Sequence, residues 1–252
     1  MIRRKCIQMR DAQKLIAHVE KWISQIISAS GAGGAVVGLS GGIDSAVCAA
    51  LMKNALGSGS VVAVKMPCHS LSLDGEHADL VARALGIKTI EVDLSETFDA
   101  YRRSLGKALE PSALAAANIK PRLRMMTVYS IAQTLGYLVC GTGNKAELTV
   151  GYFTKYGDGG CDFLPLADLT KGEVRAMAAE LGIPAPVIDK PPSAGLWEGQ
   201  TDEKEMGLTY AALDAYLSGE PVDEESLAKI RAREKASQHK KKMPEACLIG
   251  AL

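Results

Sequence analysis

One short stretch, AVVGLSGGIDSAVCAAL at residues 35–51, constrains the fold more than any other part of the chain. It begins with an apolar run typical of a buried strand, passes through SGGIDS, and continues as an apolar run with helical character. A strand that leads through a glycine-containing turn into a helix is the beginning of a parallel α/β unit. This stretch therefore predicts a parallel sheet with the turn at the carboxyl end of its first strand.

The same alternation of strand and helix continues along the first 140 residues. Strand-like segments occupy 35–39, 60–66, 88–94 and 137–141. Helical segments lie between them, and Asp74 is the predicted N-cap of one helix. Another is expected to begin near Pro121, where proline suits the first turn, and to reach Leu135. Met125 and Met126 in that helix are expected in the core. The pattern predicts one α/β unit over residues 1–252, an open, mainly parallel twisted sheet with helices on both faces.

The second half of the chain is less regular. Residues 142–169 are rich in glycine and polar side chains, and residues 184–206 combine proline-rich and acidic pieces, so both are predicted as loops. Two helices are expected near 207–217 and 223–236.

Charge and composition exclude several classes of protein. The 29 Lys and Arg residues cancel the 29 Asp and Glu residues, which gives no field for general attraction to nucleic acid or membranes. The N-terminal segment lacks the apolar core of a signal peptide, and a cytoplasmic location is expected. The six cysteines form no CxxC pair, so reduced and mostly buried thiols are favoured over a disulfide framework.

The SGGIDS turn has the chemistry of an anion site. Gly41 and Gly42 allow the backbone to turn sharply, Ser40 and Ser45 add hydroxyl groups, and the following helix offers unpaired N–H groups. The carboxylate of Asp44 would repel phosphate unless a cation intervenes, which predicts a metal. GxxxxGK[ST] is absent, which excludes a Walker-type loop. The alternative is an ordinary strand-to-helix turn.

SGGIDS resembles the pyrophosphate-binding loop of the ATP pyrophosphatase superfamily, whose members adenylate a substrate. Four further segments, NIKPRLRM at 118–125, GTGNKAELTVGYFTKYGDGGCDFLPLADLTK at 141–171, KPPS at 190–193 and QHK at 238–240, are similar to ammonia-dependent NAD synthetases. The resemblance covers most of the chain and implies an adenine nucleotide alpha hydrolase-like fold. KMPCHSLS at 65–72 is a poor match to the family, and Gly143 and Asn144 replace residues that are often Asp and His there.

The resemblance implies an ATP site and a magnesium site. The residues expected to bind ATP are Gly38, Leu39, Ser40, Gly41, Gly42, Ile43, Asp44, Ser45, Thr142, Lys171 and Ser193, the last at a position where the family commonly has threonine. Asp44 and Glu147 are the implied ligands of Mg²⁺, which prefers oxygen ligands.

The resemblance also implies a site for deamido-NAD, formed by Arg122, Lys155, Asp162, His239 and Lys240. The implied reaction is the ATP-dependent amidation of deamido-NAD by ammonia, through an adenylated intermediate, to give NAD, AMP and pyrophosphate. The expected catalytic residues are Asp44, Ser40, Lys171 and Asp162, with Asp162 as a candidate for taking the proton from ammonium. Without the resemblance, Arg122 would be read as a solvated surface charge.

Three other interpretations of these motifs are open. GTGNKA at 141–146, with Asp162 downstream, fits a Rossmann dinucleotide fingerprint, but it follows the fourth strand rather than the first. A tRNA or small-molecule thiolation enzyme would use the same adenylation loop, and a nucleotide-sensing module would bind ATP without turnover. These readings remain as alternatives.

The length and the resemblance carry three further expectations. A glutamine-dependent enzyme of this kind carries an additional glutaminase domain, for which 252 residues leave no room, so free ammonia is the expected donor. The resemblance implies a homodimer. The loops at 65–75 and 190–206 are candidate lids that keep water from the reactive intermediate.

Overall fold

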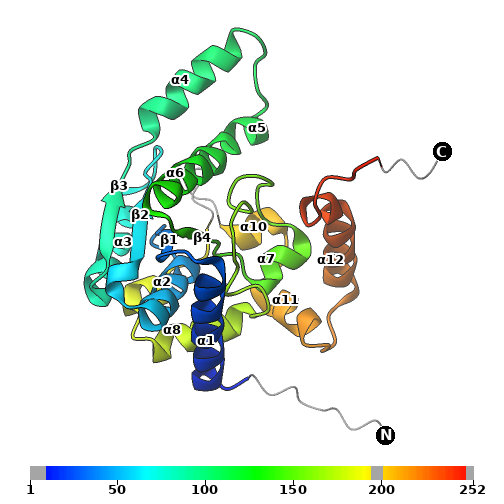
Figure 1. Cartoon of the computed structure of the whole chain (residues 1–252). Helices are drawn as coiled ribbons and strands as arrows, with labels where there is room; N and C mark the ends of the chain where they lie inside the picture. Colours follow the sequence, from blue (N-terminus) through cyan, green and yellow to red (C-terminus); the bar gives the residue numbers. More distant parts are fainter. Residues whose placement is uncertain (1–9, 194–200, 248–252) are drawn as a thin grey trace, which may run out of the picture.

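The computed structural model describes residues 10–193 and 201–247, and its centre is one parallel sheet (Figure 1). The strands within these ranges are β1 (Ala35–Gly38), β2 (Val61–Lys65), β3 (Lys88–Glu91) and β4 (Leu138–Cys140). Their order is β3-β2-β1-β4, and every adjacent pair is parallel. The predicted open, parallel α/β architecture is confirmed.

Helices surround this sheet. Those before β4 are α1 (Ala12–Ser30), α2 (Ile43–Leu56), α3 (Ser72–Leu85), α4 (Ser95–Gly106), α5 (Ala113–Ala117) and α6 (Ile119–Leu135). Those after β4 are α7 (Lys145–Val150), α8 (Lys171–Glu180), α9 (Ala185–Ile188), α10 (Asp202–Met206), α11 (Tyr210–Leu217) and α12 (Glu224–Ala236). Two short 3₁₀ turns, η1 (Ser58–Ser60) and η2 (Gln238–Lys240), complete the described elements.

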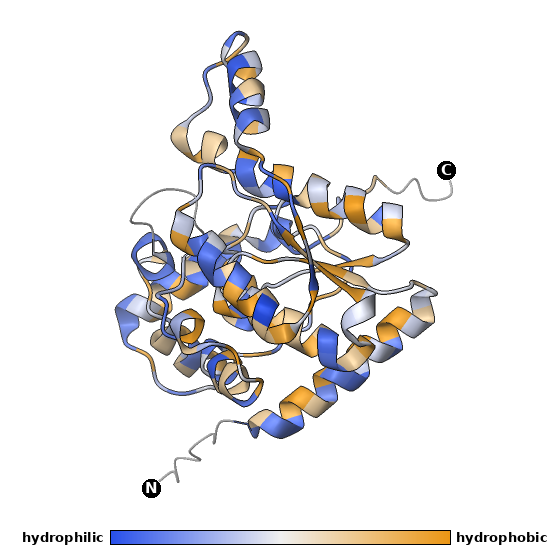
Figure 2. Ribbon diagram, turned by 90° about the vertical axis from the view of Figure 1, so that its left-hand side faces the viewer, coloured by the Kyte–Doolittle hydropathy of each residue, from blue (hydrophilic) through white to orange (hydrophobic). Residues whose placement is uncertain are grey.

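The central strand β1 is buried on both faces of the sheet, and its side chains alternate between two cores. Ala35 and Val37 of β1 belong to a core shared with α1, α2, α3 and α8. Val36, between them, belongs to a second core with β2 and α6, which includes Val64 and Val128. Helices therefore cover the two sides of the sheet, and Figure 2 shows hydrophobic residues concentrated on the strands between them.

The strand order reverses direction at β1. The chain passes from β1 to β2 and β3 on one side, then returns through α4, α5 and α6 to place β4 on the other side of β1. The carboxyl ends of β1 and β4 thus lie side by side, and ligands of open α/β sheets bind in the crevice at such a reversal. A single bridge between Cys140 and Phe163 extends the sheet beyond β4.

Two local predictions were wrong, those for Asp74 and Met126, and one on helix α6 is confirmed. Helix α3 begins at Ser72 with Leu71 as its N-cap, so Asp74 lies inside the first turn, where it pairs with Lys190. Helix α6 (Ile119–Leu135) confirms the predicted helix, because Pro121 lies in its first turn, where no hydrogen-bonded N–H is needed, and the helix ends at Leu135. The side chain of Met126 is 59% exposed because it lies on the outer side of α6.

The second half is more helical than its composition predicts. Helix α7 lies inside the predicted loop 142–169 and has only six residues, which is too short for an apolar period to appear. Helices α9 and α10 are similarly short pieces within 184–206. Helices α11 and α12 confirm the two predicted C-terminal helices, with starts at Tyr210 and Glu224.

The cysteine prediction is confirmed for the described residues. Five cysteines are free thiols there, and Cys48, Cys68 and Cys140 are buried. Within the same ranges, no helix combines the length and the apolar character that crossing a membrane requires.

Gly151 should tolerate alanine far less well than Gly31. Both end a helix with positive φ, +68° and +74°, so alanine costs about 1–2 kcal/mol of backbone strain at either place. A Cβ at Gly151 would lie 2.0 Å from Ser237 Cβ, whereas a Cβ at Gly31 would meet nothing within 4 Å. We expect Gly151→Ala to lower the free energy of unfolding by about 1–3 kcal/mol more than Gly31→Ala in urea titrations. Equal losses would contradict the close packing at Ser237.

Candidate functional site

The SGGIDS turn joins β1 to α2 at the carboxyl end of the sheet, as predicted. Gly41 has φ +73°, and a Cβ there would lie 2.3 Å from the carbonyl oxygen of Asp74, so only glycine fits. Ser45 Oγ donates to the carbonyl of Gly42 at 2.9 Å and accepts from the backbone N–H of Ser40 at 3.2 Å. These bonds hold the turn in one shape at the start of α2, whose first N–H groups and positive dipole end favour an anion.

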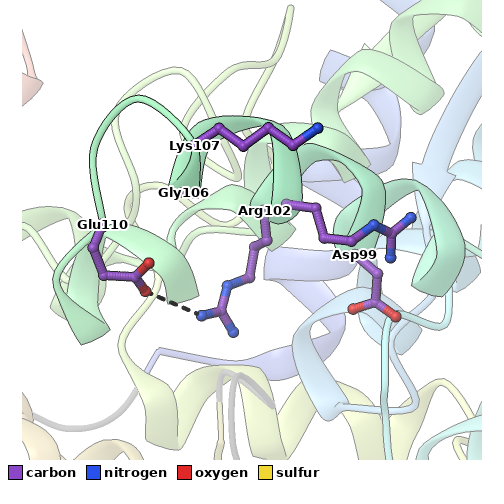
Figure 3. A pocket seen from close by; sticks show the side chains of 6 residues that line it. Asp99, Arg102, Gly106, Lys107 and Glu110 are labelled. Atoms are coloured by element: carbon purple, nitrogen blue, oxygen red, sulfur yellow. Dashed lines mark ion pairs between the residues drawn. The ribbon is translucent and has the colours of Figure 1, made fainter.

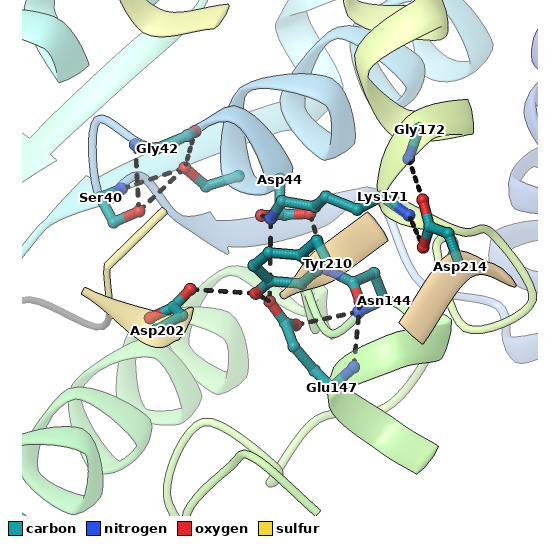
Figure 4. A network of polar contacts seen from close by, with 11 residues as sticks. Ser40, Gly42, Asp44, Asn144, Glu147, Lys171, Gly172, Asp202, Tyr210 and Asp214 are labelled. Carbon is teal, nitrogen blue, oxygen red and sulfur yellow. Dashed lines mark hydrogen bonds and ion pairs between the residues drawn. The ribbon is translucent and has the colours of Figure 1, made fainter. Parts of the chain in front are cut away.

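A buried lysine joins the turn to two other segments. Lys171 begins α8, its side chain is 3% exposed, and its Nζ donates to Asp44 Oδ2 at 2.5 Å. The same Nζ lies 3.9 Å from Glu147 Oε1 of α7. Figure 4 shows the lysine between these carboxylates. The structure thus brings together Asp44, Glu147 and Lys171, which the resemblance had implied as site residues.

The charges of this group depend on one another. Burial, followed by the neighbouring charge of Asp44, raises the pKa of Glu147 to about 8. Burial alone would lower the pKa of Lys171, but Asp44 and Glu147 outweigh it and raise that pKa. The ammonium is therefore charged at neutral pH, and burial beside Asp44 disfavours the ionised form of Glu147.

Asn144 holds both carboxylates in place and was not predicted as a site residue. It is fully buried and caps α7, accepting from Glu147 N at 3.1 Å, while its own N–H donates to Glu147 Oε2 at 3.1 Å. Its side-chain amide donates to Asp44 Oδ1 at 3.1 Å. The Asn-x-x-Glu spacing of a capping box was the available signal.

Helix α11 and the start of α10 supply three further residues that were not predicted. The Tyr210 hydroxyl lies 3.2 Å from Glu147 Oε1 and 3.0 Å from Asp202 Oδ2. Asp214 accepts from the backbone N–H groups of Lys171 and Gly172. Asp202 is 4% exposed and its Oδ1 has no hydrogen-bond partner. Sequence spacing carries no sign of the contacts to Lys171 and Glu147, because they join residues 43 and 63 positions apart.

Four of the predicted deamido-NAD residues lie close together. Lys155 Nζ donates to the carbonyl of His239 at 2.6 Å, and Arg122 Nη2 reaches the carbonyl of Lys155 at 3.4 Å. Lys240 Nζ donates to the carbonyls of Gly151 and Phe153, both at 2.8 Å. These hydrogen bonds join the η2 turn to the loop after α7.

A cavity lies between Lys240 and Glu147. Its volume is about 370 Å³, and the residues that line it include Thr142, Glu147, Asp158 and Lys240. Burial lowers the pKa of Lys240 and raises that of Asp158. The predicted ATP residue Thr142 and the predicted substrate residue Lys240 therefore face one space.

One predicted residue, Asp162, lies apart from this group. Asp162 is exposed and accepts from Tyr129 OH at 3.0 Å and from the backbone N–H of Val139 at 2.7 Å. No contact joins it to Asp44 or Lys171 among the hydrogen bonds of the described residues. Ser193 is exposed at the end of the segment 10–193, and residues 194–200 of the candidate lid lie outside the described residues.

A second hollow, of about 510 Å³, lies on the outlying helix α4 (Figure 3). It is lined by charged side chains, among which Arg102 and Glu110 form an ion pair at 3.7 Å. None of the predicted site residues lines it, so the cavity beside Glu147 is the candidate site.

Comparisons with known proteins agree with this assignment. A family model described as NAD synthase matches residues 15–244. The NH(3)-dependent NAD(+) synthetase of Carboxydothermus hydrogenoformans is 49% identical over 90% of this chain and 94% of that protein.

Two solved structures are also similar. NMN synthetase from Francisella tularensis has 35% identity and a TM-score of 0.91, over 95% of this chain and all of that chain (100%). NH3-dependent NAD synthetase from Campylobacter jejuni has 31% identity and a TM-score of 0.79, over 95% of this chain and 100% of that chain. These matches do not favour a thiolation enzyme or a non-catalytic nucleotide-binding module. The SGGIDS turn, Asp44 and Glu147 lie together where the strand order reverses, as a phosphate-binding site requires. The family match covers most of the chain and shows that this chain belongs to the NAD synthase family.

Proposed function

We propose that this chain amidates deamido-NAD with ammonia, using ATP, and releases NAD, AMP and pyrophosphate. The observation that carries the proposal is the junction of Asp44, Glu147 and Lys171 behind the SGGIDS turn, in a member of the NAD synthase family. The turn offers an anion site, the lysine offers a buried positive charge, and the adjoining cavity offers room for the second substrate.

ATP is proposed to lie with its phosphates on the turn. The proposed donors are the backbone N–H groups at the start of α2 and the hydroxyl of Ser40, while Ser45 Oγ holds the turn in shape through Gly42. Thr142 and Lys171 are proposed to bind ATP from the opposite side of the crevice. Ser193 completes the proposed set from the segment after α9.

Asp44 and Glu147 are proposed to hold Mg²⁺. The fit is supported by their position on either side of one ammonium and by the raised pKa of Glu147, since a divalent cation would relieve the repulsion between the two acids. No three His, Cys, Asp or Glu side chains of the described residues gather into a metal site, so remaining ligands would come from phosphate oxygens or water. Bound there, the metal would offset negative charge on the phosphates.

The chain's own residues would then promote two steps. The nicotinate carboxylate attacks the α-phosphorus of ATP, pyrophosphate leaves, and Lys171 stabilises the charge that builds on the phosphate oxygens. Ammonia next attacks the acyl adenylate, a proton is lost from the nitrogen, and AMP leaves. Lys155, His239, Lys240 and Arg122 are proposed to bind the dinucleotide, because several local cations can hold a pyrophosphate group on a neutral protein. Asp162 remains a proposed substrate and proton-accepting residue.

A second candidate substrate is the mononucleotide, nicotinic acid mononucleotide. It is favoured by the TM-score of 0.91 to a protein titled NMN synthetase, against 0.79 for the NAD synthetase structure. Both substrates present the same carboxylate to ATP, and they differ only in the AMP half.

The donor, the domain and the location are proposed on related grounds. Free ammonia is the proposed nitrogen source and residues 1–252 the proposed single synthetase domain, because the chain spans 94% of an NH(3)-dependent relative. A cytoplasmic location is proposed because the described cysteines are free thiols.

Purified protein with ATP, Mg²⁺ and ammonium should convert deamido-NAD to NAD, with one AMP and one pyrophosphate released per turnover. The two candidate substrates should be compared in one assay by their kcat/KM values, and we expect deamido-NAD to be preferred by at least about tenfold. A preference for the mononucleotide would replace deamido-NAD as the substrate. Binding of ATP with no pyrophosphate release from either substrate would support a nucleotide sensor and contradict the proposal.

Asp44→Asn should abolish most of the activity. The amide keeps the shape of the side chain but removes the charge that faces Lys171 and the proposed Mg²⁺, so kcat/KM is expected to fall by about 10²–10³-fold. Asp11→Asn is the matched control, because Asp11 caps α1 away from this crevice and accepts one backbone N–H. Pyrophosphate release measures both variants, and an active Asp44→Asn enzyme would argue against the metal assignment.

A homodimer is proposed through the surface of α4, α5 and α6. Large apolar side chains are exposed there, namely Tyr101, Leu109, Leu114 and Met126. Exposed apolar groups of this kind mark protein–protein contacts when they occur together. Leu114→Asp should shift light scattering from dimer to monomer, whereas Met243→Asp, an exposed residue on the C-terminal segment, should leave the mass unchanged. A monomeric wild type would contradict the proposal.

A further inference from the structure

Helix α11 presents two side chains to Lys171 from positions one helical turn apart. Tyr210 and Asp214 are four residues apart, so they lie on the same side of the helix. One contacts the lysine side chain and the other its backbone (Figure 4). Neither was predicted from the sequence. Neither belongs to the SGGIDS turn, and neither is one of the two proposed metal ligands, Asp44 and Glu147.

Asp214 fixes the start of α8. Its Oδ1 accepts from Lys171 N at 3.0 Å and its Oδ2 accepts from Gly172 N at 2.8 Å. These are two of the N–H groups that a helix leaves unsatisfied at its beginning, and a carboxylate there also complements the helix dipole. The point from which the Lys171 side chain leaves the backbone is therefore tied to α11.

Tyr210 fixes the other end of the same side chain. Its ring centroid lies 4.8 Å from Lys171 Nζ, and the residue is 6% exposed. Its hydroxyl lies between Glu147 Oε1 and Asp202 Oδ2, which prevents the ring from turning away. The ring covers one side of the Lys171 ammonium. The hydroxyl contacts Glu147, whose carboxylate lies on another side of the same ammonium.

Lysine needs such support because its four-carbon stem is flexible. A charge that stabilises a transition state must already be at the correct place, and a displacement of about 1 Å can cost about a hundredfold in rate. Buried ion-pair partners alone leave several rotamers of the stem open, whereas a ring on one side and a fixed backbone origin leave few.

We propose that Tyr210 and Asp214 are positioning residues that hold the Lys171 ammonium in place for the adenylation step. The inference rests on the proposed function, since it assigns Lys171 to the phosphates of ATP. It extends the site to helix α11, where Asp214 lies 43 residues after Lys171 in the chain.

The test compares Tyr210→Phe, Tyr210→Leu and Asp214→Asn with the wild type. Phenylalanine keeps the ring wall and loses the hydroxyl, leucine loses both, and asparagine loses one acceptor and the charge. Tyr216→Phe and Asp223→Asn are matched controls, because Tyr216 on the same helix bonds Glu234 and Asp223 caps α12.

The readout is deamido-NAD-dependent exchange of labelled pyrophosphate into ATP, without ammonia, together with thermal melting. We expect exchange to fall about tenfold in Tyr210→Phe and Asp214→Asn and about a hundredfold in Tyr210→Leu, with KM for ATP changed less than about threefold. A loss in kcat with little change in KM is the signature of misplaced transition-state contacts, and Tyr216→Phe and Asp223→Asn should match the wild type.

Three results would overturn the inference. One is wild-type exchange in Tyr210→Leu and Asp214→Asn, another is an equal loss in the control variants, and the third is a rise in KM that accounts for the whole loss. Failure of the proposed function is a separate outcome, because the wild type itself would then show no exchange with either deamido-NAD or the mononucleotide. If Tyr210→Leu does not fold, the more conservative Tyr210→Phe and Asp214→Asn decide the question.

Discussion

The contact between the buried ammonium of Lys171 and the carboxylate of Asp44 is the interaction on which the site depends. The two residues are 127 positions apart in the chain, and their side chains meet at 2.5 Å. Removing two charges from water costs several kcal/mol per ion, and mutual attraction repays this only when further hydrogen bonds satisfy both groups. Asn144 supplies such a bond to Asp44, and Glu147 lies on the far side of the ammonium. The ion pair between Lys171 and Asp44 therefore contributes more to the arrangement of the site residues than to the stability of the fold.

The sheet makes this meeting possible. Because β4 lies beside β1, the turn after β1 and the turn after β4 open at the same edge, which brings Asp44 and Glu147 to one crevice. Helix α8 packs against α1 and α2 through their shared core. Its first residue, Lys171, therefore points into that crevice. Helix α11 closes the group from outside the sheet, where Asp214 and Tyr210 contact the lysine at both of its ends.

The parts of the site that the sequence predicted are those with a local signature. Gly41 and Asp44 belong to one six-residue motif, and its place after a buried strand was visible without any comparison. Lys171 and Glu147 were identified only through resemblance to the family, since no spacing connects them to the motif. Asn144 had a local signal in its capping box, yet its contact with Asp44 depends on the approach of two turns.

The sequence by itself determined the strand-turn-helix unit, the parallel α/β class and the glycine at position 41. These depend on apolar runs of strand and helix length and on backbone conformations that neighbouring residues impose. Only the tertiary structure decided that β4 lies beside β1, that Met126 faces outward, and that Tyr210 and Asp214 contact Lys171. The physical reason is that these contacts arise from packing between distant segments, and a side chain's partner across such a distance leaves no periodic trace in the chain.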